Sequence, residues 1–297
     1  MKKLIIMDNG NIFFEQQPKV IYAPKNEANS GEQAKFKLGN QWIKLDNVAA
    51  NGDYIHEGSH TALAEVVSSG IAIMSNFTNP CPVEYHAQQV QMNNISYVAC
   101  RSSDFLHDGE TIITADDMAQ KINEKNGNRM DMPEQLYELT DMEKVCNFKE
   151  YYNKMVLFDA LVLNQDRHTN NIAFIRDVSG NIKNANLFDN GAAFLSDHSW
   201  YGLDAGVEEN IKKAAPRLFW KSFDESVEYV RKTSNTTFKT AFCENDLENV
   251  FSTFETLYPE IVFDTVREIF EIQKQKYPEM FCSMKELIET QRIEEMV

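Results

Sequence analysis

Residues 163–174, LNQDRHTNNIAF, gather polar and charged side chains directly after the apolar run KMVLFDALVL. Asp166 and Asn171 stand there in the spacing D-x-x-x-x-N, and LFDNGAAF places Asp189 further along the chain. Transfer of a phosphoryl group from a nucleotide requires a carboxylate near the attacking hydroxyl and oxygen ligands for Mg²⁺. These residue types therefore indicate phosphoryl transfer, with Asp166 beside the acceptor and Asn171 and Asp189 as metal ligands.

Each of these parts is common by itself. D-x-x-x-x-N occurs by chance in acidic chains, Asp-Asn-Gly usually marks a hairpin turn, and Asp-Arg-His after a helix usually forms a solvated helix end. The joint order favours a reaction centre: an apolar helix, the polar loop, a hairpin, and Asp189 after an apolar strand. Gly191 is expected to let the chain turn sharply beneath the ligand. Asn170 competes with Asn171 as a metal ligand, and the spacing favours Asn171.

The phosphates of a nucleotide need backbone N–H groups and a cation, and SGEQAKFKLGNQWIKLDN offers both. Ser30 and Gly31 form a predicted turn whose N–H groups can cradle anions. Lys44 follows apolar residues in the second strand of a predicted hairpin, from which it can reach the phosphates. In the alternative interpretation, Lys35, Lys37 and Lys44 are solvated charges at a strand edge. The downstream motif favours a phosphate-binding Lys44.

A lysine in that position needs a carboxylate partner, and two glutamates qualify. Glu65 lies within the apolar helical stripe ALAEVV, where an unpaired carboxylate would be costly. Glu57 stands at the expected start of the same helix, where the helix dipole alone would favour a negative charge. Helical periodicity leaves the choice between them open.

The elements that must position these residues suggest an α+β chain of two parts. Residues 1–112 alternate β-like runs with turns, which predicts three hairpins and one helix over EGSHTALAEVVSSGIAIM. Residues 113–297 predict a capped helix, a long buried helix ending before the polar loop, two short strands around Ser179-Gly180-Asn181, and three or four amphipathic helices. We therefore expect a bilobal, protein-kinase-like fold: a small β-rich N-lobe with one helix, a larger helical C-lobe, and a ligand cleft between them.

Composition narrows the partners and the compartment. The 45 acidic and 29 basic residues give a formal charge of -16, which repels nucleic-acid backbones and anionic lipids, so we expect neither as a direct partner. The five cysteines are scattered and the six histidines form no HExxH motif, which predicts reduced thiols and no zinc site. We expect no secretory signal and no membrane span, hence a cytoplasmic protein; an effector exported without a cleaved signal would look the same.

LNQDRHTNNIAF and LFDNGAAF together resemble motifs of the HipA-like serine/threonine kinases, bacterial members of the protein-kinase and phosphatidylinositol-kinase superfamily, and their stand-alone members most. SGEQAKFKLGNQWIKLDN is similar to that family's phosphate loop and lysine strand. EGSHTALAEVVSSGI is similar to its small-lobe helix, with Glu57 aligned to the family's acidic residue. The resemblance covers the chain from about residue 28 to 232.

The resemblance implies an ATP- and Mg²⁺-dependent kinase that transfers the γ-phosphate to a serine or threonine of a protein. It implies that Asp166 orients the acceptor or acts as base, that Asn171 and Asp189 bind Mg²⁺, and that Lys44 holds the ATP phosphates. Autophosphorylation at Ser30 is a further hypothesis.

Three further residues are expected to hold the Asp166 loop in place rather than to take part in the chemistry. Arg167 and His168 belong to the motif and are expected to support the loop. Asp159, inside the apolar helix, is expected to accept hydrogen bonds from that loop.

Two departures from the family leave alternatives open. Its toxin members carry an N-terminal domain and bind a DNA-binding antitoxin; because few residues precede Ser30, we do not expect that pairing here. The tripeptide that begins with the metal-binding Asp189 is Asp-Asn-Gly rather than Asp-Phe-Gly. The Asp-Asn-Gly form is also similar to that of the lipid-kinase branch. The alternatives are thus a kinase for a lipid or small-molecule hydroxyl, a nucleotide-binding pseudokinase or scaffold, and an enzyme that transfers AMP.

Overall fold

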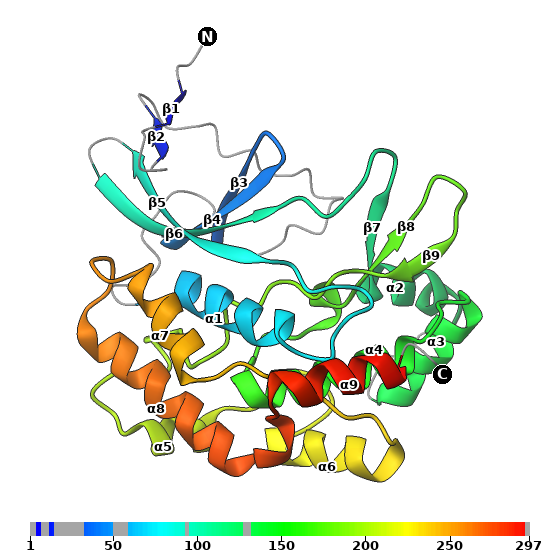
Figure 1. The fold of residues 1–297 in the computed structure, drawn as a ribbon. Helices are drawn as coiled ribbons and strands as arrows, with labels where there is room; N and C mark the ends of the chain where they lie inside the picture. The colour runs from blue at the N-terminus through cyan, green and yellow to red at the C-terminus, as the bar shows by residue number, and fades with distance from the viewer. Residues whose placement is uncertain are drawn as a thin grey trace.

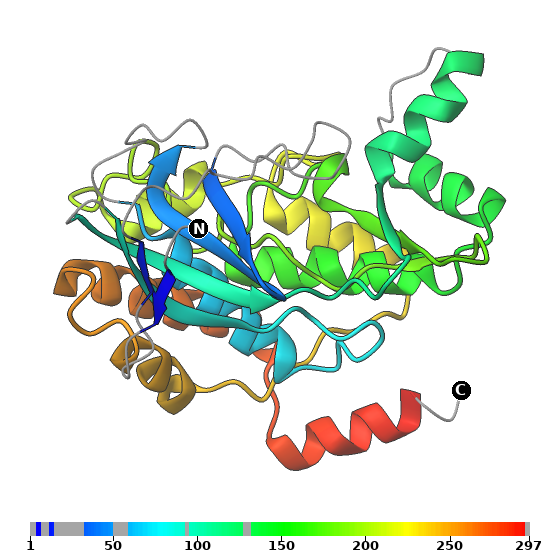
Figure 2. The same cartoon turned by 90° about the horizontal axis from the view of Figure 1, so that it is seen from above.

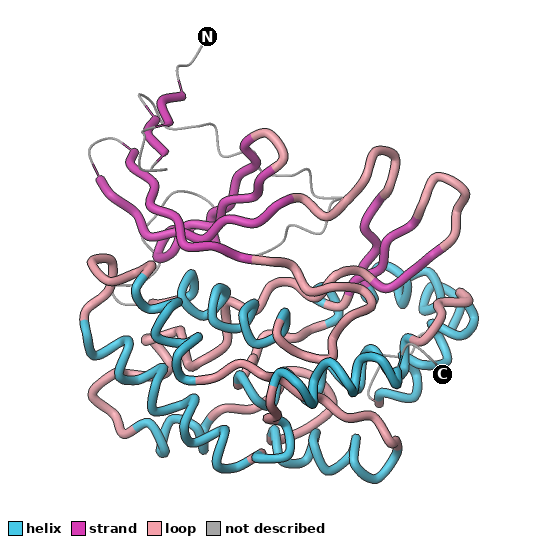
Figure 3. The backbone as a smooth tube through the Cα atoms, viewed as in Figure 1, coloured by secondary structure: helices cyan, strands magenta, loops and turns pink. Residues whose placement is uncertain are grey.

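The chain folds into a small sheet-bearing lobe stacked on a larger helical lobe (Figure 1). The computed structural model describes residues 4–6, 12–14, 33–49, 59–92, 95–126 and 132–294. Ser30, Gly31 and Glu57 lie outside these described residues. The tube view shows the strands gathered in the upper part and the helices beneath them (Figure 3). This is the bilobal α+β arrangement that we expected.

A six-stranded sheet with the order β1-β2-β5-β6-β4-β3 forms the small lobe. The three expected strand pairs are present, since β1 pairs with β2, β3 with β4 and β5 with β6 in antiparallel fashion, whereas β2 and β5 pair in parallel. Gly39 takes a left-handed φ of 59° in the β3–β4 turn, a conformation that glycine adopts without steric cost. The strands are β1 (Leu4–Ile6), β2 (Ile12–Phe14), β3 (Gln33–Leu38), β4 (Gln41–Ala49), β5 (Tyr85–Met92) and β6 (Ile95–Ser103).

Helix α1 (Thr61–Ile73) lies between this sheet and the helical lobe (Figure 1). It packs against β4, β5 and β6 above and against α7 (Glu244–Ser252) below. Most of its residues are therefore buried, as expected for a helix that is apolar around most of its circumference. The sequence pattern had suggested that this helix starts at Glu57, but it begins at Thr61.

The large lobe is built around α4 (Phe148–Val162), whose residues are almost all buried. Leu163 follows it in the left-handed conformation, with φ 57°, and so ends the helix where the polar loop begins. Two of its helices, over Pro133–Met142 and Val207–Lys213, had not been expected. Besides α4 and α7, the lobe contains α2 (Ala115–Asn126), α3 (Pro133–Met142), α5 (Val207–Lys213), α6 (Phe223–Thr233), α8 (Glu260–Lys276) and α9 (Met284–Glu294).

A second sheet, three-stranded and antiparallel, is separate from the sheet of the small lobe. It consists of β7 (Thr111–Thr114), β8 (Ala173–Arg176) and β9 (Ile182–Asn184), in the order β7-β8-β9. The domain boundary expected at residue 112 thus falls within β7. Because β8 starts two residues after the polar loop, this sheet holds the loop's exit in place.

The outermost helix, α9, lies along one side of the molecule when it is seen from above (Figure 2). Gln291 ties it to the segment after α1, with Nε2 donating to the Ser75 carbonyl at 2.9 Å. Among the helices of the described ranges, none is both long enough and apolar enough to cross a bilayer.

Candidate active site

A buried arginine fixes the loop that follows α4. Arg167 is 5% exposed and binds both carboxylate oxygens of Asp159, each at 3.0 Å. It also donates to the carbonyls of Asn171 at 3.2 Å and Phe188 at 2.8 Å, and to Asn190 Oδ1 at 2.6 Å. One side chain thereby ties together α4, the polar loop and the segment before Gly191. The supporting contacts expected of Arg167 and Asp159 are confirmed.

The loop presents Asp166 and Asn171 side by side. The Asn171 amide donates from Nδ2 to the Asp166 carbonyl at 2.9 Å, which orients the side chain of this buried residue. Asn170 instead accepts a hydrogen bond from Thr114 Oγ1 at 3.3 Å, at the end of β7. Its side chain is therefore engaged away from Asp166, and the geometry agrees with the spacing in favouring Asn171.

His168 lies between the backbone of the loop and the Asp166 carboxylate. Its Nδ1 accepts from the Asn170 N–H at 3.1 Å, and its Nε2 lies 3.7 Å from Asp166 Oδ2. Burial lowers the pKa of His168, an effect that the Asp166 carboxylate opposes. The loop-supporting contact expected of this residue is thus present.

Lys44, Glu65 and Asp189 converge from three segments that are far apart in the sequence. The Lys44 ammonium contacts Glu65 Oε1 and lies 2.5 Å from Asp189 Oδ1. Glu65 is fully buried, and its second oxygen accepts from the Asn190 N–H at 2.8 Å. Between the two candidate glutamates, the structure places Glu65 against Lys44; Glu57 lies outside the described residues.

Burial and the neighbouring charges act in opposite directions on the pKa values in this cluster. Burial works against the charge on Lys44, but the Asp189 and Glu65 carboxylates outweigh it and raise the pKa of Lys44 well above its ordinary value. Burial also raises the pKa of Glu65. It opposes ionisation of Asp189 too, yet Lys44 and Lys35 hold the pKa of Asp189 below its ordinary value. Asp189 is therefore a carboxylate at neutral pH, the form that binds metal ions.

The sharp turn of the Asp-Asn-Gly tripeptide lies at its aspartate. Asp189 has φ 60°, in the left-handed region, whereas Gly191 has no such φ. A Cβ placed on Gly191 would meet Glu65 Oε1 at 3.5 Å, an ordinary contact distance. Our expectation that Gly191 provides the turn was wrong, because aspartate itself tolerates the left-handed conformation. Unusual backbone conformations of this kind cluster at functional sites.

Lys35 belongs to the same cluster, although the sequence singled out only Lys44 from this hairpin. Lys35 lies directly opposite Lys44 in the β3–β4 register, which puts both side chains on one face of the sheet. Burial lowers the pKa of Lys35, and the Asp189 carboxylate opposes that shift. The solvated-charge interpretation suits Lys37 instead, which pairs with Asp104 at the exposed edge.

Asp46 is a second residue that sequence reasoning missed. It is 1% exposed and follows Lys44 by two positions, so both side chains lie on one face of β4. Its carboxylate accepts from the hydroxyls of Ser59 at 2.5 Å, Thr61 at 2.6 Å and Tyr258. It also accepts from the Thr61 N–H at 3.3 Å and thereby caps α1 from a neighbouring strand. The lysine strand and the helix that carries the glutamate are thus joined directly.

A histidine pair connects the start of α1 to the segment after Gly191. His60 Nδ1 lies 2.7 Å from His198 Nε2, and His60 Nε2 lies 3.1 Å from the Phe194 carbonyl. The His60 N–H also donates to the Ser196 carbonyl at 3.1 Å. Burial, together with the neighbouring His198, lowers the pKa of His60 to about 3.

We expect this buried histidine to make the protein less stable on acidification. In the unfolded chain His60 takes up a proton at about pH 6.5, but the folded protein resists that proton until about pH 3. The free energy of unfolding should therefore fall by about 1.4 kcal/mol per pH unit between these limits. His198, whose pKa burial also lowers, adds a loss of the same sign.

Urea denaturation over a pH series measures this slope. His60→Gln should flatten it, and His107→Gln, at an exposed loop position, serves as the matched control. Equal slopes for the wild type and His60→Gln would contradict the assignment to His60.

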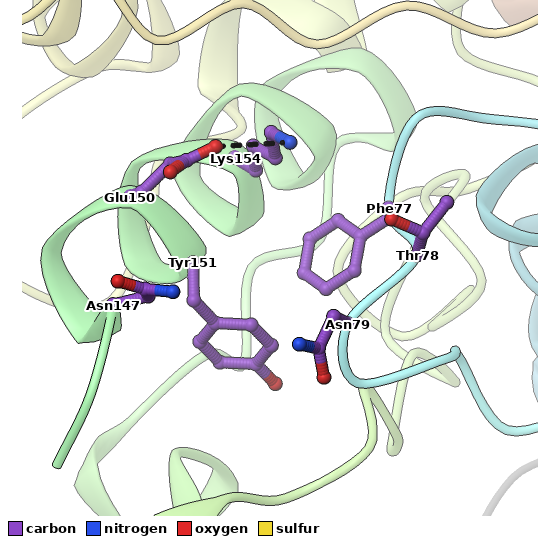
Figure 4. A pocket seen from close by; sticks show the side chains of 7 residues that line it. All are labelled: Phe77, Thr78, Asn79, Asn147, Glu150, Tyr151 and Lys154. Carbon is purple, nitrogen blue, oxygen red and sulfur yellow. Dashed lines mark ion pairs between the residues drawn. The ribbon is translucent and has the colours of Figure 1, made fainter. Parts of the chain in front are cut away.

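A cavity of about 180 Å³ lies between α4 and the segment 77–79 (Figure 4). The rings of Phe77 and Tyr151 line it with their centroids 5.1 Å apart, and the Glu150–Lys154 ion pair lies along the α4 side. None of the residues that the sequence assigned to chemistry lines this cavity. The candidate site is therefore the Lys44 cluster with the Asp166 loop. The lining consists of Phe77, Thr78, Asn79, Asn147, Glu150, Tyr151 and Lys154.

Comparisons with known proteins bear on the fold. No protein-family model and no curated protein sequence matches the chain. Among solved structures, the Helicobacter pylori proinflammatory kinase CtkA matches over 86% of this chain and 92% of its own, with a TM-score of 0.52 and 13% identity. The chain has a kinase fold. At this identity the likeness shows the fold alone, and it confirms the bilobal kinase-like architecture expected from the sequence.

A second solved structure also matches the chain. The toxin–antitoxin complex of HipA, HipB and operator DNA from Shewanella oneidensis MR-1 matches over 88% of this chain and 67% of its own, at 13% identity. Its TM-score of 0.41 is too low to support a structural argument.

Proposed function

We propose that this chain is an ATP- and Mg²⁺-dependent serine/threonine kinase that phosphorylates proteins. The observation that carries the proposal is the convergence of Lys44, Glu65 and Asp189 in a kinase fold, next to a loop that presents Asp166. The serine or threonine acceptor is supported by the sequence resemblance. The formal charge of -16 supports a protein acceptor over a lipid surface or nucleic acid, and we propose the cytoplasm as the compartment.

Each residue of the cluster has a separate task in this proposal. An ammonium group has three N–H donors, and the contacts of Lys44 with Glu65 and Asp189 use two of them. We propose that Lys44, held by Glu65, binds the nucleotide phosphates, with Lys35 adding positive charge on the same face. Asp166 accepts the proton of the acceptor hydroxyl, whose oxygen bonds to the γ-phosphorus as the bond from that phosphorus to the β–γ bridging oxygen breaks.

The residues present also fit a magnesium site. Mg²⁺ prefers hard oxygen ligands and keeps several waters, so one carboxylate and one amide oxygen suffice. The Asp189 carboxylate and the Asn171 Oδ1 would hold it, and when bound it would neutralise negative charge on the phosphates. Both donors are oxygen atoms, which suits Mg²⁺ rather than a metal held by histidine or cysteine. The described residues contain no group of three or more His, Cys, Asp or Glu side chains that could hold a metal ion.

Nucleotide binding tests the role of Lys44. A ligand that binds only the folded state at a hundred times its Kd stabilises a protein by about 2.7 kcal/mol. Mg-ATP should therefore raise the unfolding temperature of the wild type, and Lys44→Met should lose most of that increase. Lys37→Met, on the same hairpin but paired with Asp104 at the exposed edge, is the matched control. Equal stabilisation of the wild type and Lys44→Met would count against the proposed phosphate site.

A further inference from the structure

A segment of the chain that is rich in basic residues contacts the Asp166 carboxylate through Arg217. Residues 212–221, from the last two residues of α5 to the approach to α6, read KKAAPRLFWK, with four basic and no acidic side chains in a chain whose acidic residues outnumber the basic by 45 to 29. Lys213 is paired with Glu209 one turn earlier in α5. Near the middle of this segment, Arg217 donates from Nη1 to Asp166 Oδ1. Arg217 therefore places a positive charge directly beside the carboxylate that would receive the acceptor hydroxyl.

The chain on either side of Arg217 is anchored. Ala214 is 6% exposed, and Phe219 packs against the core of the large lobe. The Trp220 ring lies with its centroid 5.6 Å from that of Phe219 and 5.5 Å from that of Tyr229 on α6. Because its neighbours are held by packing, the backbone at Arg217 has a defined place opposite the Asp166 loop.

The contact between Arg217 and Asp166 can be exchanged at small cost. Their side chains are 59% and 41% exposed, and an ion pair in that setting contributes about 0–1 kcal/mol. A guanidinium has five N–H donors in a planar fork suited to carboxylates. When an acceptor hydroxyl approaches Asp166, these donors can bind an anionic group on the same substrate. That group must lie close to the acceptor, because Arg217 contacts the carboxylate that receives the hydroxyl.

An exposed aromatic ring stands next in sequence to a residue that contacts the Asp166 loop. Trp200 is 78% exposed, and its neighbour Tyr201 donates its hydroxyl to Gln165, the residue before Asp166. An exposed tryptophan next in sequence to a contact of the Asp166 loop, together with the positive charge of Arg217, suits a polypeptide, which offers apolar and acidic side chains together. Extended polyanions such as nucleic acid fit less well, since the chain as a whole is strongly negative.

We infer that Arg217 and the basic segment around it select a polypeptide substrate in which acidic side chains flank the acceptor serine or threonine. This inference rests on the proposed function and names the substrate class of the same site. Arg217 determines specificity by binding the flanking carboxylate and by releasing Asp166 to the acceptor hydroxyl.

Peptide binding tests the inference without requiring turnover. The probes are two short fluorescein-labelled peptides with a central serine, one flanked by aspartates and the other by asparagines. The wild type should bind the aspartate peptide about three- to tenfold more tightly, the effect of one or two partly exposed charge pairs, and the preference should shrink as salt is added. Arg217→Gln should lose the preference.

Two further variants sharpen this test. Arg217→Glu should come to favour a third peptide, flanked by lysines. Arg231→Gln, which removes an arginine of similar exposure on α6, should keep the wild-type preference. Equal binding of the aspartate and asparagine peptides by the wild type, or an unchanged preference in Arg217→Gln, would overturn the inference.

Phosphate transfer to the same peptides separates this inference from the proposed function. Transfer from γ-labelled ATP to both peptides at equal rates would leave the kinase in place and overturn the role of Arg217. An Arg217-dependent acidic preference in binding without transfer to either peptide would support the role of Arg217 and count against the kinase.

Discussion

Replacing Arg167 by methionine is expected to lower the free energy of unfolding by about 3–5 kcal/mol, because removing one partner of a buried ion pair leaves an uncompensated charge. That charge is Asp159, which is 5% exposed and binds Arg167 through both carboxylate oxygens. The substitution also removes the donors to three further oxygens on neighbouring loops. The double variant Arg167→Met/Asp159→Leu should recover a large part of the loss, since a buried pair can be replaced by apolar residues.

Urea denaturation of the wild type, Arg167→Met, Asp159→Leu and the double variant gives the coupling energy between Arg167 and Asp159 directly. Arg267→Met is the matched control, because Arg267 on α8 forms ion pairs with Glu248 of α7 and Asp264 of α8, whose side chains are 52% and 62% exposed. This substitution should lower the free energy of unfolding by no more than about 1 kcal/mol, as for other exposed ion pairs. An Arg167→Met variant no less stable than this control would show that Arg167 does not hold the site together.

The motif order and the elements around it could be predicted from the sequence because they rest on local patterns. The β3–β4 hairpin follows from Gly39-Asn40 between two alternating runs, and α4 from one long apolar segment. The position of Lys35 opposite Lys44 could have been found in the same way. Once the two-residue turn is assigned, the hairpin register pairs these two residues.

Contacts between distant segments could not be predicted in this way. Glu65 and Glu57 are equally compatible with helical spacing, and the choice of Glu65 depends on how α1 packs beneath the sheet. The start of α1 at Thr61 depends on Asp46, a capping residue supplied by another element and therefore invisible to a local capping rule. The contact of Arg217 with Asp166 joins segments whose approach depends on the fold of the large lobe.

Replacing Asp166 by asparagine is expected to slow phosphate transfer by about 10²–10⁴-fold, the usual contribution of a positioned acid–base group. The variant should remain folded, because the Asp166 side chain is 41% exposed and its ion pair with Arg217 is itself exposed. Asp108→Asn, at an exposed position in the loop before β7, changes the same functional group away from the site and is the matched control.

Transfer of label from ATP to protein, measured for purified wild type and Asp166→Asn in the presence of Mg²⁺ and a cell lysate, tests the central claim most directly. The wild type and Asp108→Asn should transfer label from γ-labelled but not from α-labelled ATP, and Asp166→Asn should lose that transfer while keeping the wild-type unfolding temperature. Transfer from α-labelled ATP, undiminished transfer by Asp166→Asn, or no transfer by the wild type despite stabilisation by Mg-ATP would contradict it.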